Sequence, residues 1–462
     1  MKYDLVVVGA GPAGIFTALE MTRRCPGASV LILEQGPGLS QRSCPLNMRL
    51  SSCRHCSPCR VVTGWGGAGA FSDGKLTLTT DFGGQLGQYI GTESLSDLIE
   101  YVDKTYVEFG GTEQVWGGDT GATRDLARRA AAADLILIPA RIRHLGTENC
   151  PVILGNMERE IRSRGVEIRT GVAVKSVRVS SGRATGVTTT QGEEISARYV
   201  VAAPGRVGAD WLARQAEDLG LEMKHNPVDV GFRVEVPSVI TEPLTDVLYE
   251  CKILYYTKSF DDQVRIFCMC PYGMVTVEEN DGLVTVNGHS FRSSRTDNTN
   301  FALLVSKTFT QPFKEPIAYG RNIAALANML GGGVLVQRLG DLLNGRRSTV
   351  HRMERGLVRP TLQDATPGDL SLVLPYRHLK SILEMIEALD HLVPGVKSRH
   401  TLLYGVEVKF YSSRPQLEPT LETRVRNLFA AGDGAGVTRG LIQASAAGVH
   451  VARVISDRIK GE

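Results

Sequence analysis

Long hydrophobic runs and a strong excess of charge of one sign are both missing from this sequence of 462 residues. No apolar stretch approaches the roughly 20 residues that a membrane-spanning helix needs. Lysine and arginine total 52 against 49 aspartates and glutamates, and a net charge of +3 gives no reason to expect nucleic acid as the main partner. The first apolar stretch begins at residue 3, which leaves no room for a signal peptide. These absences predict a cytoplasmic protein without membrane or nucleic-acid partners.

A glycine-rich turn between two apolar runs opens the chain. The run at residues 5–8 leads into this turn, a helical pattern continues to about residue 24, and a second apolar run ends at Glu34. Strand, glycine turn, helix, strand and acidic residue in this order predict a dinucleotide-binding site, because the glycines admit a pyrophosphate and the acidic residue accepts bonds from ribose hydroxyls. The residues of the turn that we assign to the cofactor are Gly9, Gly11, Pro12, Ala13 and Gly14.

A second glycine-rich stretch, residues 64–76, reads GWGGAGAFSDGKL. Its glycines allow the backbone to approach a flat cofactor closely. Trp65 and Phe71 supply apolar anchors, which argue against a mobile surface loop. We assign four of its residues to the cofactor: Gly66, Gly67, Ala68 and Gly69.

The C-terminal part repeats the opening theme. The sequence NLFAAGDGAG predicts a strand and a turn, and a helix rich in small residues begins at about Gly440. A carboxylate at the mouth of this turn could bind the polyol of a flavin, and the N-terminus of the helix would direct its positive dipole end forward. The assigned residues here are Gly432, Asp433, Gly440 and Leu441, with Val174 and Gly205 from the strand-rich middle of the chain.

Three of these blocks, VVVGAGPAG with Glu34, YVVAAPG and LFAAGDGAG, resemble the two-dinucleotide-fold flavoproteins, of which glutathione reductase and fumarate reductase are distant examples. The blocks GGAGAFSDGKL, FCMCPYG and VNGHSF extend the resemblance over nearly the whole chain, to proteins grouped as FAD-dependent dehydrogenases. The resemblance implies FAD and redox chemistry, with the ribityl chain on Asp433. Two departures limit it: the chain has no second complete GxGxxG in a strand–helix context, and no C-x4-C pair near the flavin loops. A separate NAD(P)H domain and disulfide reductase chemistry are therefore not expected.

The predicted fold is α/β. A discontinuous, three-layer Rossmann-like FAD-binding domain would comprise residues 1–205 and 376–462, and a β-rich substrate domain, residues 206–375, would be inserted before the last motif. Apolar periodicity predicts helices at residues 94–109, 123–133, 152–164 and 376–392.

Four cysteines lie within residues 44–59, a loop-like segment of the FAD-binding domain: Cys44, Cys53, Cys56 and Cys59. With the C-x8-C-x2-C-x2-C spacing, one loop could direct three thiolates toward one metal centre, and the fourth cysteine would complete the set of four ligands. The alternatives are a [4Fe-4S] cluster, a tetrahedral zinc site, or thiols without a metal. A cluster would pass electrons singly to the flavin, so a soluble electron carrier could replace NAD(P)H.

The flavin carries the hydride chemistry, and the protein adds orientation and a proton source. The candidate catalytic residues are His289, Tyr272 and Arg439. Cys268 and Cys270, which alternate on a predicted strand, are assigned to packing. The predicted function is an FAD-dependent oxidoreductase acting on a small organic substrate, by reduction of an activated C=C bond or the reverse desaturation. The alternatives are an amine or amino-acid oxidase, a tRNA-modifying flavoprotein using a basic stretch near residues 345–360, and a redox sensor using the cysteine cluster.

Overall fold

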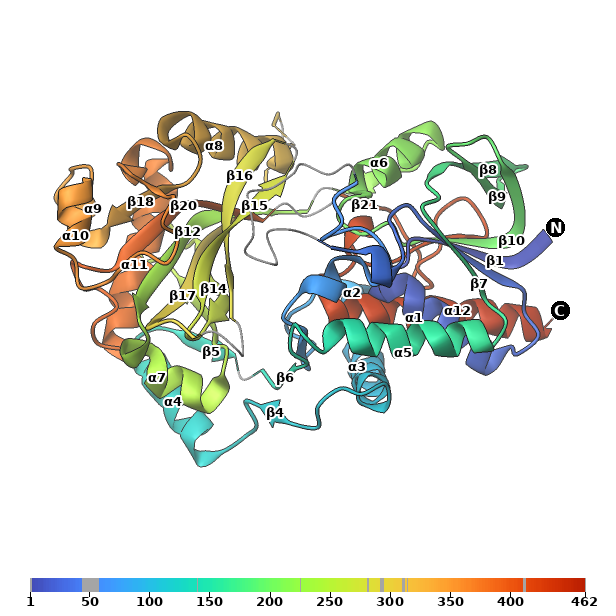
Figure 1. The fold of residues 1–462 in the computed structure, drawn as a ribbon, viewed down its shortest axis with the longest axis horizontal. Coiled ribbons are helices and arrows are strands. Elements are labelled where there is room, and N and C mark those ends of the chain that lie inside the picture. Colours follow the sequence, from blue (N-terminus) through green and yellow to red (C-terminus); the bar gives the residue numbers. More distant parts are fainter. Residues whose placement is uncertain are drawn as a thin grey trace. The chain divides into compact units, whose positions relative to one another are not determined.

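The computed structural model describes residues 2–43, 58–138, 140–224, 226–280, 282–290, 295–309, 312–313, 315–409 and 413–461 (Figure 1). The chain divides into two compact units. The first comprises Met1–Gln114, Arg143–Asn226 and Ser412–Glu462, and the second comprises Val115–Ile142 and Pro227–Tyr411. Both units combine helices with sheets, so the α/β fold class expected from the sequence is confirmed.

A parallel sheet forms the centre of the first unit. Its strands are ordered β7-β2-β1-β10, and β22 pairs with the C-terminal part of β10. The runs VVV and VLIL are apolar on consecutive residues because these strands are buried on both faces. The bounds of the strands are β1 (Lys2–Val8), β2 (Val30–Glu34), β7 (Glu167–Thr170), β10 (Glu194–Ala202) and β22 (Leu428–Ala430).

Helices cover one face of this sheet, and a β-hairpin with one helix covers the other. The helical side contains α1 (Pro12–Arg24), α3 (Thr92–Glu108), α5 (Cys150–Ser163) and α12 (Leu441–Gly461) around one apolar core. On the opposite side β8 (Val174–Ser180), β9 (Arg183–Thr189) and α6 (Ala209–Asp218) enclose a second core. The expected three layers are present. Shorter elements of this unit are η1 (Leu39–Gln41), η2 (Gly67–Phe71), β3 (Lys75–Thr77), α2 (Leu86–Ile90), β11 (Met223–Lys224), β21 (Arg414–Pro415) and η4 (Asp433–Ala435), and β6 (Ile142–His144) lies at its edge.

Small residues allow α1 and α12 to approach closely. A Cβ on Gly448 would lie 2.1 Å from the carbonyl oxygen of Ala13. The hydroxyl of Thr17 donates to the carbonyl of Gly448 at 3.2 Å. The Ala- and Gly-rich sequence of α12 is therefore a packing requirement, and it fixes the helix beside the glycine turn that starts α1.

A mixed sheet of eight strands, in the order β19-β18-β20-β12-β17-β14-β13-β5, forms the second unit. Its long central strands pair antiparallel. The strands are β5 (Ile136–Ile138), β12 (Val228–Pro237), β13 (Lys252–Tyr256), β14 (Gln263–Cys270), β17 (Asn298–Lys307), β18 (Leu335–Arg338), β19 (Thr366–Pro367) and β20 (Leu402–Lys409). A separate hairpin is formed by β15 (Met274–Asn280) and β16 (Leu283–His289), and β4 (Val115–Trp116) is a short strand.

Helices shield one face of this sheet. Apolar residues of α4 (Gly121–Ala132), α7 (Ser238–Leu248), α8 (Pro316–Gly331) and α11 (Tyr376–Leu392) share a core with alternate residues of the central strands. The remaining short helices are α9 (Leu339–Leu343), α10 (Val350–Glu354) and η3 (Leu370–Leu372). Among the described residues, no helix combines the length and apolarity needed to cross a membrane.

The unit boundaries differ from those expected from the sequence, which were 1–205 and 376–462 for one domain and 206–375 for the other. Residues 206–226 belong to the first unit, because α6 packs on its sheet and β11 pairs with β21. Residues 376–411 belong to the second unit, because β20 pairs with β12 and β18. Residues 115–142 join it through the pairing of β5 with β13. These boundaries depend on strand pairing between segments far apart in the sequence. Local composition does not reveal such pairing.

Replacing Gly231 with alanine should destabilise the second unit. This glycine lies at a register shift between β12 and β20, and an added Cβ would lie 1.8 Å from the carbonyl oxygen of Leu303. We expect Gly231→Ala to lower the free energy of unfolding by about 1–3 kcal/mol through overpacking. Gly121→Ala is the matched control, since a Cβ there meets no atom within 4 Å. Equal urea-denaturation midpoints for the two variants would contradict this account.

Candidate functional site

The turn between β1 and α1 is shaped by close backbone contacts. Gly9 has φ of +105°, and a Cβ on it would lie 2.1 Å from the carbonyl oxygen of Ala203. A Cβ on Gly14 would lie 2.0 Å from the carbonyl oxygen of Gly9. At Gly11, by contrast, a Cβ would meet no atom within 4 Å. Two glycines are thus required by packing, while the third leaves open backbone that a phosphate can approach.

The N-terminus of α1 has no cap of its own. Gly11 occupies the N-cap position without a side-chain hydrogen bond, and Pro12, which lacks an N–H, occupies the first turn. The first N–H groups of a helix have no partner within the helix, and the helix dipole places positive charge there. This terminus, preceded by open backbone at Gly11, fits the pyrophosphate of a dinucleotide.

Glu34 is 5% exposed and joins three backbone segments. Its Oε2 accepts the N–H of Ala10 at 2.8 Å, and its Oε1 accepts the N–H groups of Gly36 at 2.8 Å and Gly64 at 2.9 Å. A carboxylate offers about four lone-pair sites, so about one remains for a ribose hydroxyl. The sequence predicted the ribose contact alone, whereas the structure gives this residue a second task of holding the turn together.

Arg42 is a buried cation that no sequence motif predicted. Its guanidinium donates to the carbonyl oxygens of Arg60, Val61 and Trp65 at 2.9, 2.6 and 2.6 Å, respectively. Burial lowers the pKa of Arg42 to about 10, and nearby Glu34 acts in the opposite direction. The side chain remains charged at neutral pH, and it ties the segment before the cysteine-rich loop to the segment after it. An arginine in a loop has no sequence pattern that marks it for this role.

The second glycine-rich stretch packs against the first. The N–H of Gly66 donates to the carbonyl of Ala10 at 2.8 Å. A Cβ on Gly67 would lie 3.1 Å from Cα of Gly11, and a Cβ on Gly69 would lie 2.6 Å from Cδ2 of Leu441. Ala68 is half-buried within the same 3-10 turn, η2. The structure therefore brings the two predicted glycine loops and the start of α12 together.

Asp433 shapes the turn that precedes α12. Its Oδ1 accepts the hydroxyl of Thr438 at 2.9 Å, and its Oδ2 accepts the N–H of Gly440 at 3.0 Å. Burial raises the pKa of Asp433 above its ordinary value, although the N–H of Gly440 works against that shift. Gly432 packs against Ala13, where a Cβ would come within 3.1 Å. The turn therefore lies beside the first turn of α1. Each carboxyl oxygen of Asp433 accepts one hydrogen bond and has a lone pair left to accept another.

Gly205 and Val174 are the remaining predicted cofactor residues. Gly205 has φ of +65°, and its carbonyl oxygen lies 2.0 Å from where a Cβ on Gly434 would be, so these two turns are in contact. Val174 begins β8 and lies with Val6, Val8 and other residues in the core on the hairpin side of the sheet. We call the site formed by the two glycine loops and the turn before α12 the cradle. Gly205 borders this cradle, while the side chain of Val174 packs in the core.

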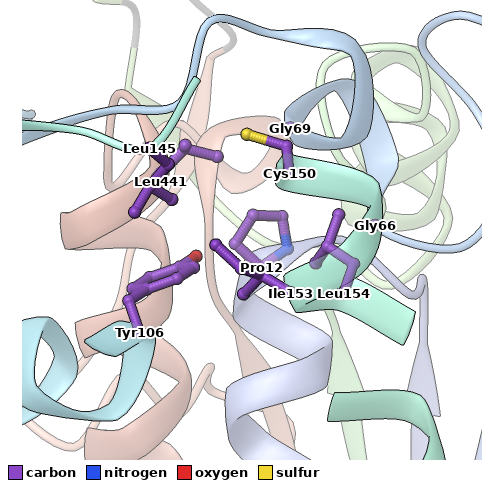
Figure 2. Close-up of a pocket in the computed structure, with 9 residues that line it drawn as sticks. All are labelled: Pro12, Gly66, Gly69, Tyr106, Leu145, Cys150, Ile153, Leu154 and Leu441. Carbon is purple, nitrogen blue, oxygen red and sulfur yellow. The ribbon is translucent and has the colours of Figure 1, made fainter. Parts of the chain in front are cut away.

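Beside these loops is a small apolar cavity of about 10 Å³, about the space of one water molecule (Figure 2). Its lining residues are Pro12, Gly66, Gly69, Tyr106, Leu145, Cys150, Ile153, Leu154 and Leu441. Burial raises the pKa of the Cys150 thiol to about 12, so this cysteine stays protonated at neutral pH. The hydroxyls of Tyr106 and Ser445 lie 3.1 Å apart. The cavity is too small for a flavin ring, and we assign it to the packing behind the glycine loops.

The candidate catalytic residues fall in different units. Arg439 is in the first unit, directly before α12, and its N–H donates to the carbonyl of Gly83. Tyr272 and His289 belong to the second unit. The hydroxyl of Tyr272 donates to Oε1 of Glu242 at 2.8 Å, and this bond is the main cause that raises its pKa. His289 ends β16 opposite Met274 of β15 and is half-buried. Their proposed catalytic roles stay predictions.

The predicted metal site lies mostly outside the described residues, since Cys44, Cys53 and Cys56 belong to that part of the chain. Cys59 is described and is exposed. Its carbonyl accepts the hydroxyl of Thr63 at 2.6 Å. Within the described ranges no group of three or more His, Cys, Asp or Glu side chains is arranged to hold a metal. The choice between iron–sulfur, zinc and unligated thiols therefore stays open.

Taken together, an uncapped helix N-terminus, two apposed glycine loops and an acidic residue at the end of β2 define a dinucleotide-binding fold. Three family models match the chain. Residues 229–410 match the model described as "FAD-dependent protein, C-terminal domain-like", residues 117–240 match "Pyridine nucleotide-disulphide oxidoreductase", and residues 361–462 match "Glucose inhibited division protein A". The chain is an FAD-dependent oxidoreductase.

Individual relatives are distant. A protein of Clostridium beijerinckii described as uncharacterized is 26% identical, and the match covers 99% of this chain and 81% of that protein. Rhodocoxin reductase of Rhodococcus erythropolis is 22% identical over 50% of this chain and 61% of its own length. Among solved structures, 3-ketosteroid-delta4-(5alpha)-dehydrogenase from Rhodococcus jostii RHA1 has 15% identity and a TM-score of 0.45, covering 98% of this chain and 97% of that one.

Replacing Glu34 with alanine should weaken FAD binding and loosen the cradle. The change removes a charge-assisted acceptor and leaves three backbone N–H groups without their carboxylate. We expect the Kd for FAD to rise by the equivalent of about 1–3 kcal/mol, measured by fluorescence titration of the apoprotein. Glu217→Ala, at an exposed position of α6, is the control. If both variants retain FAD equally, Glu34 does not have the role described here.

Proposed function

We propose that the protein transfers a hydride between FAD and a small organic substrate, and that it reduces an activated C=C bond or catalyses the reverse desaturation. Bound FAD supplies the two-electron redox chemistry. The observation that carries the proposal is that the described residues contain one dinucleotide fold, while the second unit is built on a largely antiparallel sheet. Without a second nucleotide fold, an organic molecule is the natural partner for the hydride.

Arg414 supports a substrate with an anionic group. It lies on β21, which pairs with β11, and the nearby Asn226 donates to the carbonyl of Gly436 in the turn before α12. Its Nε and Nη1 are inaccessible to solvent and have no hydrogen-bond partner among the described residues. Buried donors without acceptors are costly, so a ligand carboxylate is a fitting partner for this guanidinium. We propose that Arg414 binds the carboxylate of the substrate.

An amine or amino-acid oxidase is the second candidate, because an amino acid also carries a carboxylate for Arg414. The basic stretch near residues 345–360 gives little support to the tRNA-modifying alternative. Arg346 pairs with Asp341 at 2.9 Å, and Arg352 donates to the carbonyl of Arg347, so part of this charge is used within the unit. A redox sensor using the cysteine cluster, electron entry through a soluble carrier and a cytoplasmic location remain predictions.

Anaerobic spectroscopy separates the two leading candidates. We expect the chemically reduced holoprotein to regain its oxidised visible spectrum when an enone such as 4-oxo-2-pentenoic acid is added. Amines and amino acids should leave the oxidised protein unchanged. Reduction of the oxidised protein by amino acids, with no reoxidation by enones, would reverse this ranking.

The same assay tests the role of Arg414. Arg414→Gln should raise KM for 4-oxo-2-pentenoic acid at least about tenfold, because a charge-assisted bond to the carboxylate is lost, with kcat changed much less. The methyl ester of the acid, which has no carboxylate, should show no such change. Arg424→Gln, at an exposed position of the same unit, is the control. An unchanged ratio of acid to ester KM in Arg414→Gln would exclude an anion-binding role.

A further inference from the structure

The face of the second unit's sheet opposite its helices carries a buried polar stripe. In β12 the residues Val230, Phe232 and Val234 belong to the apolar core, whereas Arg233 and Glu235 alternate with them and point to the other face. Both charged side chains have 0% exposure. Fully buried charges are retained only with close partners, so this face is built for something other than packing alone.

Arg233 and Lys409 share the carboxylate of Glu407. The Arg233 guanidinium donates to both oxygens of Glu407, at 2.7 and 3.1 Å, and Lys409 Nζ lies 3.1 Å from Oε1 of the same carboxylate. Arg233 Nη1 also donates to Asn300 Oδ1 at 2.6 Å. Glu278 lies 3.4 Å from Lys409 and is partly exposed. Two cations therefore surround one fully buried carboxylate.

A pair of cysteines borders this cluster at the end of β14. The register between β14 and β17 shifts between Phe267 and Cys270, so the strand bulges there. Cys268, inside the bulge, has φ of +46°. The sequence predicted a regular strand, but the bulge instead turns the two thiols toward each other, with Cys268 Sγ and Cys270 Sγ 3.8 Å apart.

The two cysteines differ in solvent exposure, and both lie near the Arg233 guanidinium. Cys268 is half-buried, whereas Cys270 has 0% exposure. The carbonyl of Cys268 accepts a bond from Arg233 Nη1 at 3.1 Å. Burial lowers the pKa of Lys409, but Glu407 and, more weakly, a negative charge on Cys268 raise it, so the net shift is upward.

We propose that Cys268 and Cys270 form a redox-active dithiol that reacts with small-molecule disulfides, an activity separate from the hydride chemistry of the first unit. Cys268 Sγ attacks one sulfur of the disulfide, whose S–S bond breaks and releases one thiol. Cys270 Sγ then attacks the Cys268 sulfur of this mixed disulfide, forms the Cys268–Cys270 bond and releases the second thiol. Two cysteine thiols are oxidised, one disulfide is reduced to two thiols, and both protons end on the released thiols.

The order of attack follows from access, because an external disulfide can reach the half-buried sulfur of Cys268 before the enclosed sulfur of Cys270. The neighbouring hairpin encloses the cluster: a Cβ on Gly288 would lie 2.2 Å from Arg233 Nη1. Cys268 is thus the attacking cysteine, and Cys270 is the one that resolves the mixed disulfide.

Oxidised glutathione is a suitable probe for the folded holoprotein. After exposure, the protein is denatured, alkylated with iodoacetamide and digested with trypsin, which gives residues 266–292 as one peptide with no other cysteine. In the wild type this peptide should carry no alkyl group and lack two hydrogens relative to the reduced form. Dithiothreitol before alkylation should restore two alkyl groups. In Cys270→Ser, glutathione should remain attached at Cys268, and in Cys268→Ser the peptide should be alkylated at Cys270.

Two references are measured in the same sample. Conversion of added N-acetylcysteine to its mixed disulfide with glutathione shows that the oxidant is active, and Cys251, which is 1% exposed, should carry no glutathione if the fold stayed closed. Two alkyl groups on the wild-type peptide, in a sample that meets both references, would overturn the proposal. So would attachment of glutathione at Cys270 in Cys268→Ser to the same extent as at Cys268 in Cys270→Ser. The wild-type measurement decides the matter even if a serine variant does not fold.

Discussion

The carboxylate of Glu34 is the interaction on which the cofactor cradle depends. It accepts N–H groups from Ala10, Gly36 and Gly64, which belong to three separate stretches of backbone. Those bonds hold the turn before α1 next to the second glycine loop. Because the carboxylate is buried, its oxygens need these donors in place of water. Glu34, which the sequence pattern assigns to a ribose, therefore also holds together the site that would bind it.

Close backbone packing is the second constraint on the first unit. Contacts at Gly9, Gly14 and Gly448 leave no space for a side chain, so glycine fixes the positions of α1 and α12, the two helices that begin at the cradle. The second unit follows a different rule. Its central strands place apolar residues toward the helices and charged residues toward the hairpin, where ion pairs and amide side chains satisfy them. Arg233 and the bulge at Cys268 both lie on this charged face.

The strand, glycine turn, helix and strand at the start of the chain were predicted correctly because their pattern is local. The assignment of Gly9, Gly11, Gly14 and Glu34 to a cofactor stays a prediction. The helix near residues 376–392 was also predicted correctly, but its assignment to the first domain was wrong, since β20 beyond it pairs with β12. Arg42, Arg414 and the bulge at Cys268 could not be predicted, because each depends on contacts between segments far apart in sequence.

The most direct test of the central claim is the identity and amount of the nucleotide that the protein carries. Protein purified without added cofactor and then denatured should release FAD, identified by chromatography against FAD, FMN and NAD(P) standards, in a ratio approaching one per chain after reconstitution. One cradle in the first unit and no second dinucleotide fold among the described residues predict that ratio. Release of FMN or NAD(P) in place of FAD, two dinucleotides per chain, or no uptake of FAD on reconstitution would contradict the account.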